Sequence, residues 1–195
     1  MHPHQFLARV EPITMALYEA LRQAELAAYA ERRCLEPEYE HHLYQFEIAE
    51  SMDDFDDSKL NHMHKRVAEA HEAILLIDTA AAAAAGAILQ TAKQCITLAW
   101  PDKEIRFTKG RIIGATQTLA SVIWYGRNQD QHFEEGNGMR KETLGCIKKL
   151  SDEVGLNISS IDEKPRSLAK DILYIIGWSD YASYAKGINE LLQQS

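Results

Sequence analysis

The residues best suited to chemistry in this chain lie in one short stretch, Arg127-Asn128-Gln129-Asp130-Gln131-His132. Arginine carries a planar, permanently charged group that binds phosphate, and histidine exchanges protons near neutral pH. Glycines flank the stretch on both sides. An arginine and a histidine this close together raise the question of whether the chain cuts RNA, and the candidate catalytic residues are Arg127, Asn128 and His132.

The spacing within this stretch sets a geometric condition. On a continuous helix, Arg127 and His132 would point about 140° apart around the axis, so both could not reach one phosphate. Either the backbone must leave the helix here, which the flanking glycines would allow, or a second subunit must complete the site. Asn128 and His132 are four residues apart and share a helix face, so the amide could orient the imidazole.

The elements that must position this stretch are predicted to be helices. The signals are apolar residues at helical spacing, prolines that start or stop a helix, and glycines that end one. They predict helices over residues 11–33, 36–51, 59–100, 109–125, 138–154, 164–176 and 180–193. No stretch shows β alternation. The predicted fold class is all-α, a single helical bundle of about six or seven helices that forms one domain over residues 1–195.

Composition and charge narrow the function classes. The three scattered cysteines fit neither a disulfide framework nor a zinc ribbon, and the N-terminus lacks a secretion signal, which together predict a cytoplasmic protein. The apolar stretch 74–92 has the length of a membrane span, but its alanine run predicts a buried helix instead. The net charge is −8, yet residues 101–149 hold 9 basic and 6 acidic side chains, and this net-basic segment contains the Arg127–His132 stretch.

An arginine, a polar residue and a histidine in this order, late in an all-α domain, resemble the signature of the HEPN superfamily (higher eukaryotes and prokaryotes nucleotide-binding domain). Its members are helical bundles, many of them metal-independent endoribonucleases of toxin–antitoxin, phage-defence and CRISPR systems. The resemblance covers Arg127, Asn128 and His132. Family members commonly dimerise so that two motifs face one cleft. The resemblance therefore implies a homodimer with a composite site, which would meet the geometric condition.

The resemblance also implies roles for these residues. His132 would act as general acid or base, Arg127 would bind the scissile phosphate, and Asn128 would position one of them. Attack by the ribose 2′-hydroxyl would leave a 2′,3′-cyclic phosphate and would need no metal or cofactor. The expected partners are RNA, a second copy of the chain and an antitoxin protein. Asp130, Glu134 and Glu135 depart from the pattern, because their charges could raise the pKa of the histidine but would also repel phosphate.

Further RNA-binding residues are expected near the motif. Tyr125 precedes it by two residues and could stack on a base. The net-basic segment adds three candidates for contacts to phosphate, which are Lys109, Arg111 and Arg140.

Three alternatives remain open. With 10 arginines and 8 histidines, a shuffled chain would contain about 0.4 Arg-x-x-x-x-His pairs, and this chain has a second one at Arg66 and His71, which we interpret as a coincidence on a helix surface. A non-catalytic helical interaction module, or a scaffold that binds RNA or a nucleotide, would keep the fold without the enzyme. A metal-carboxylate bundle would need two E-x-x-H helices, and only Glu38 and His41 offer that spacing, so no metal site is expected.

Overall fold

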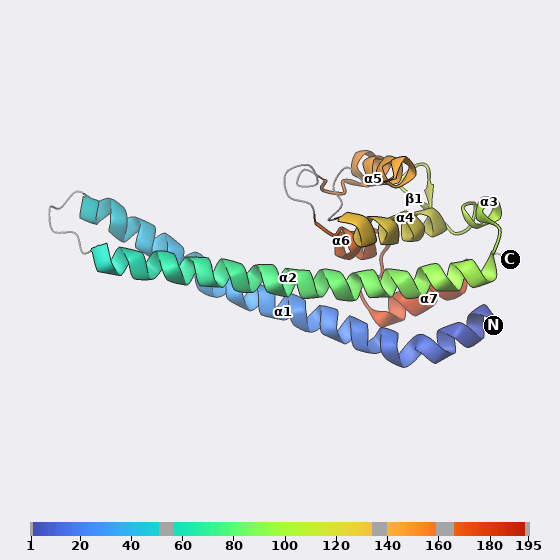
Figure 1. The fold of residues 1–195 in the computed structure, drawn as a ribbon, viewed down its shortest axis with the longest axis horizontal. Coiled ribbons are helices and arrows are strands. Elements are labelled where there is room, and N and C mark those ends of the chain that lie inside the picture. Colours follow the sequence, from blue (N-terminus) through green and yellow to red (C-terminus); the bar gives the residue numbers. More distant parts are fainter. Residues whose placement is uncertain (1, 51–56, 134–139, 159–165, 194–195) are drawn as a thin grey trace. The chain divides into compact units, whose positions relative to one another are not determined.

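The computed structural model describes residues 2–50, 57–133, 140–158 and 166–193. Within these ranges the chain forms seven helices and a single short hairpin (Figure 1), which confirms the predicted all-α fold class. The helices are α1 (Pro3–Glu50), α2 (Asp57–Ala99), α3 (Lys103–Arg106), α4 (Leu119–His132), α5 (Lys141–Val154), α6 (Ala169–Ile175) and α7 (Tyr181–Leu192). The strands are β1 (Ile112–Ile113) and β2 (Gln117–Thr118).

The chain divides into two compact units. The larger unit consists of Met1–Leu21 and Ala82–Ser195, and the smaller consists of Arg22–Ala81. The single domain expected from the sequence stays a prediction.

Helix α1 differs from the sequence-based expectation. The sequence predicts a start at Pro12 and a new helix at Pro37, whereas α1 is continuous from Pro3 to Glu50. A proline at the first helical position costs nothing, because its missing N–H has no helical partner there, and Pro3 occupies that position. Pro37 removes one hydrogen bond at a cost of about 3 kcal/mol, and a helix with several turns on each side can continue in spite of it.

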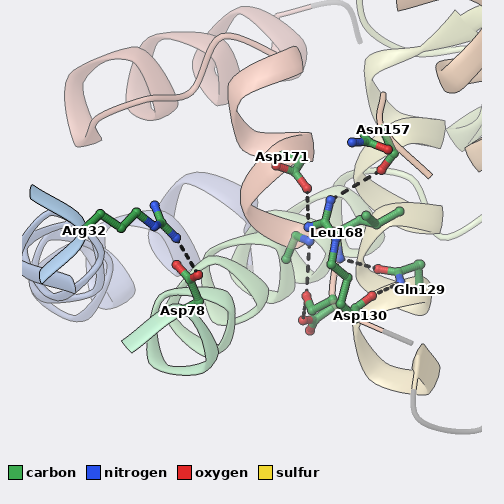
Figure 2. Close-up of polar contacts among 10 residues, drawn as sticks. Arg32, Asp78, Gln129, Asp130, Asn157, Leu168 and Asp171 are labelled. Carbon is green, nitrogen blue, oxygen red and sulfur yellow. Dashed lines mark hydrogen bonds and ion pairs between the residues drawn. The ribbon is translucent and has the colours of Figure 1, made fainter. Parts of the chain in front are cut away.

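In the smaller unit, parts of α1 and α2 are joined by a hydrogen-bonded ion pair. Arg32 donates to Asp78 over 2.8 Å (Figure 2). Both side chains are partly exposed, so the pair contributes less than about 1 kcal/mol. Several large apolar side chains of this unit are exposed, namely Leu26, Tyr29, Tyr44, Leu75 and Leu76.

The core of the larger unit contains the second half of α2. Ile88, Leu89 and Ile96 are fully buried there, and the helix ends before Pro101 as predicted. In the described part of the chain, one helical stretch, His64–Ala99, is long and apolar enough to cross a membrane, with a mean hydropathy of 1.7 in its most apolar window. This is weak evidence for a membrane protein, because the core helix of a soluble protein passes the same test.

A hairpin replaces the first half of the helix predicted over residues 109–125. Strands β1 and β2 pair antiparallel, with Ile112 opposite Thr118. Gly110 and Gly114 have φ angles of +91° and +66°, a conformation that favours glycine and that a right-handed helix excludes. Helix α4 begins only at Leu119, after Thr118 accepts a hydrogen bond from the Ser121 N–H as its N-cap.

The ends of α5 and α6 and the start of α7 agree with the sequence to within one residue, whereas α5 and α6 begin later than predicted, because residues 140 and 166–168 are described and are not helical. Helix α5 ends at the predicted Gly155, which has a φ of +74°, and Asp180 caps α7. Helix α5 begins at Lys141 and not at 138, and the predicted cap Asn137 lies outside the described residues. The start predicted for the next helix, at residue 164, also lies outside them, and α6 itself begins at Ala169.

Candidate nucleic-acid interface

The Arg127–His132 stretch is the last part of α4, and its backbone remains helical as far as His132. The sequence spacing required the backbone to leave the helix here if one chain were to form the site alone. The backbone does not leave the helix within this stretch. Arg127 and His132 diverge around the axis, so a site that used both on one phosphate would need a second copy of the chain. His132 is partly buried at the end of the helix.

The Arg127 guanidinium is held by two neighbouring side chains. Its Nε donates to Gln90 Oε1 on α2 over 2.9 Å, and its Nη1 donates to Asp130 Oδ2 over 2.7 Å. The side chain is only 19% exposed. Among the described residues, Nη2 of Arg127 donates to none, so one edge of the guanidinium keeps a donor for a ligand.

The two middle residues of the stretch fasten the segment that enters α6 (Figure 2). Gln129 is fully buried, and its amide donates to the Arg166 carbonyl over 2.8 Å and accepts from the Leu168 N–H over 2.7 Å. Asp130 Oδ1 accepts from the Ser167 hydroxyl. The side chains of Gln129 and Asp130 thus form hydrogen bonds with buried or partly buried backbone and side-chain groups. These bonds give both residues a structural role, independent of any catalytic role of the motif.

Asp130 makes the ion pair with Arg127 inside a desolvated region. Its side chain is 12% exposed, and burial raises the pKa of its carboxyl, while the hydrogen bond from Ser167 and the charge of Arg127 partly offset that rise. The charge repulsion toward phosphate expected of Asp130 is therefore reduced by its pairing with Arg127.

Gly86 on α2 has no side chain, and this leaves room for the Asp130 carboxylate. A Cβ at this position would lie 2.2 Å from Asp130 Oδ2, far inside van der Waals contact. The short Asp130 side chain is held by Ser167 and Arg127, so it cannot move away without losing those bonds.

We therefore expect Gly86→Ala to destabilise the protein by about 1–2 kcal/mol, measured by urea unfolding. Overpacking of about 1–3 kcal/mol outweighs the gain of up to about 1 kcal/mol that alanine brings inside a helix. Gly145→Ala in α5 is the matched control, because no atom beyond its own helical turn lies within 4 Å of its new Cβ, and it should stabilise by about 0.5–1 kcal/mol. Equal stabilisation by both changes would contradict the packing described for Asp130.

Asn128 contacts a different partner, Lys93, which the sequence patterns did not single out. Its Oδ1 accepts from Lys93 Nζ on α2 over 2.7 Å. The same ammonium lies 4.4 Å from the ring centroid of Trp124, and the Arg106 guanidinium lies 4.4 Å from that centroid too. A lysine fixed by an amide and an aromatic ring is a well-ordered positive charge.

The positive charges of three arginines act on this lysine. Burial lowers the pKa of the Lys93 ammonium, and the positive charges of Arg127, Arg106 and Arg140 lower it further. We name this group the Trp124 cluster, and its members are Lys93, Arg106, Trp124, Arg127, Asn128 and Arg140. Hydrogen bonds and ring contacts join members from α2, α3 and α4, and Arg140 at the start of α5 acts on Lys93 through its charge.

The other RNA-binding residues predicted from the sequence have separate surroundings. Tyr125 packs against Phe107 with 5.3 Å between ring centroids, and Lys109 lies 5.5 Å from the ring centroid of Trp100. Arg111 donates to the Ile176 carbonyl. Of the four predicted contacts, only Arg140, the exposed N-cap residue of α5, carries a charge that lowers the pKa of Lys93.

The second Arg-x-x-x-x-His pair lies in the smaller unit. Arg66 and His71 are both exposed on α2, as the interpretation of a helix surface requires. No group of three or more potential metal-binding side chains occurs within the described ranges. The side chains of Glu38 and His41 lie outside what the structure describes.

Comparison with known proteins adds no further guide to function. No protein-family model, curated protein or solved structure shows significant similarity to the chain. The HEPN resemblance rests on Arg127, Asn128 and His132 alone and stays a prediction.

Proposed function

We propose that the chain is a HEPN-like RNA-binding protein and that it binds RNA through the Trp124 cluster. The observation that supports this most is the pairing of Lys93 with Asn128 and of Arg127 with Gln90, which places two cations on adjacent positions of α2 and α4 in a chain whose net charge is −8. Arg106 contributes its charge beside them but is buried and donates to the Trp100 and Pro101 carbonyls. A local group of positive charges in a chain with a negative net charge favours binding of a polyanionic ligand at that group.

The composition of the cluster suits phosphate. Arginine offers several N–H donors to phosphate oxygens, and lysine adds a compact point charge. Nη2 of Arg127, which donates to no residue in the described ranges, and the exposed Arg140 can contact a ligand without breaking the bonds that hold the fold. The acidic remainder of the chain would disfavour nonspecific binding elsewhere on the surface.

Metal-independent RNA cleavage is the second candidate function. The position of His132 at the end of α4 and the partial exposure of Arg127 support it, provided that a second copy brings its own motif to the same phosphate. The bonds from Arg127 to Gln90 and Asp130 favour the non-catalytic alternative, because they already occupy two of the guanidinium nitrogens. A homodimer, an antitoxin partner, a toxin or phage-defence role and a cytoplasmic location follow from the resemblance and are part of this proposal.

We expect the purified full chain to bind a labelled single-stranded RNA in an anisotropy titration. Absence of binding would contradict the proposal. Incubation of the same RNA with the chain in EDTA tests cleavage. A nuclease would leave 2′,3′-cyclic phosphate ends without metal, and His132→Ala would abolish cleavage but not binding. RNA that is bound and stays intact would establish the non-catalytic alternative.

A further inference from the structure

Lys93 and Arg127 form an ordered pair of cations from two helices. On α2, Gln90 and Lys93 are three residues apart, and on α4 their partners Arg127 and Asn128 are adjacent. The two hydrogen bonds therefore fasten neighbouring positions of the two helices to each other. Both positive groups are held in place before any ligand arrives, which reduces the entropy lost on binding.

Among the described residues, the charge of this pair is incompletely neutralised. Arg127 is paired with Asp130, whereas Lys93 donates only to the neutral Asn128 among the described residues. Arg140 is exposed nearby and makes no hydrogen bond to a described side chain. An anion that bridged Lys93 and Arg127 would relieve the mutual repulsion of these two charges.

The aromatic rings of this region are already in contact with other groups. Lys93 and Arg106 both lie 4.4 Å from the ring centroid of Trp124, and Phe107 meets that ring edge-on at 5.8 Å. Tyr125 is tilted against Phe107 as well. Base stacking needs an open ring face, so these side chains are poorly placed to distinguish bases. The sequence-based expectation that Tyr125 contacts a base finds no support in this packing.

We propose that Lys93 and Arg127 together bind neighbouring phosphates of a phosphate chain, and that recognition is of the backbone and independent of the bases. Lys93 is thereby assigned a ligand-binding role beside the motif residues. In naming RNA as the source of the phosphates, the inference rests on the proposed function. Inorganic polyphosphate offers the same chemistry without bases.

The test is a set of anisotropy titrations of the folded full chain with labelled oligo(U), oligo(A) and oligo(C) of equal length. We expect affinities within about threefold of one another and a loss of affinity with added salt, because phosphate contacts dominate. Lys93→Met, which keeps the aliphatic stem over Trp124, is expected to weaken all three about tenfold. Unlabelled polyphosphate should compete with RNA on the unaltered chain and compete far less in the variant.

Two further variants separate lost charge from lost structure. Asn128→Asp keeps Lys93 but replaces the amide beside its ammonium group with a carboxylate. This negative charge neutralises the lysine and should weaken RNA binding by a similar factor. Lys148→Ala removes an exposed lysine of α5 outside the cluster and should change affinity by less than about twofold. Thermal unfolding of each variant checks that the fold is kept.

The outcomes distinguish this inference from the proposed function. A preference of more than about tenfold for one base, unchanged in Lys93→Met, would overturn the backbone inference and leave RNA binding in place. Binding of polyphosphate that depends on Lys93, without binding of any RNA, would support the phosphate site and overturn the proposed function. Binding of neither would overturn both.

Discussion

Gln129→Leu will lower the free energy of unfolding by about 2–4 kcal/mol, although leucine is the more apolar residue. Gln129 is fully buried, and its amide satisfies both the Arg166 carbonyl and the Leu168 N–H. Leucine would leave these two backbone groups unpaired in the interior, at about 1–3 kcal/mol each. Its greater apolar surface would recover only part of that loss.

Urea unfolding measured by circular dichroism gives the comparison. Gln131→Leu is the matched control, because Gln131 lies two residues further along the same helix and is exposed, and its replacement should shift stability by no more than about 0.5 kcal/mol. If both variants unfolded at the same urea concentration, Gln129 would not be fastening the segment that leads to α6, and the structural role assigned to the middle of the motif would be wrong.

The sequence predicted most of the helices because their signals are local. The stop of α2 before Pro101 and the end of α5 at Gly155 depend on single residues with restricted or permissive backbones. The interior prolines of α1 were not predicted, because proline is disfavoured inside a helix and usually marks a helix start. The hairpin before α4 was not predicted either. Two glycines with positive φ outweighed the apolar residues around β1.

The candidate site was only partly predictable. Arg127 and Asn128 were identified by residue type, but their partners Gln90 and Lys93 are 37 and 35 residues away along the chain. Such pairings depend on how α2 packs against α4, which local patterns do not contain. One signal was present: Lys93 is the only lysine or arginine between residues 67 and 102, a lone cation in an apolar helix.

The burial of Gln129 could have been inferred from helical spacing. Val122, Gly126 and Gln129 follow one another at intervals of four and three residues, so they share the face that packs into the core. Ending the predicted helix at Tyr125 hid this relation. Polar residues that continue an apolar face are expected to be structural, and this is why the residues between Arg127 and His132 matter for the fold.

Reversal of two charges in the Trp124 cluster is expected to weaken RNA binding roughly hundredfold. In Lys93→Glu/Arg140→Glu, two cations that face the proposed phosphate chain become carboxylates, which repel it. The control, Lys148→Glu/Lys149→Glu on α5, changes the net charge of the chain by the same amount at exposed positions outside the cluster. Circular dichroism of both variants confirms that they are folded.

Anisotropy titration of one labelled RNA with the unaltered chain and these two variants tests the central claim most directly. Binding through the Trp124 cluster predicts that the cluster variant loses about two orders of magnitude in affinity while the α5 variant loses less than about fivefold. Equal losses in the two variants would show that affinity follows net charge alone, and would contradict RNA binding at this site.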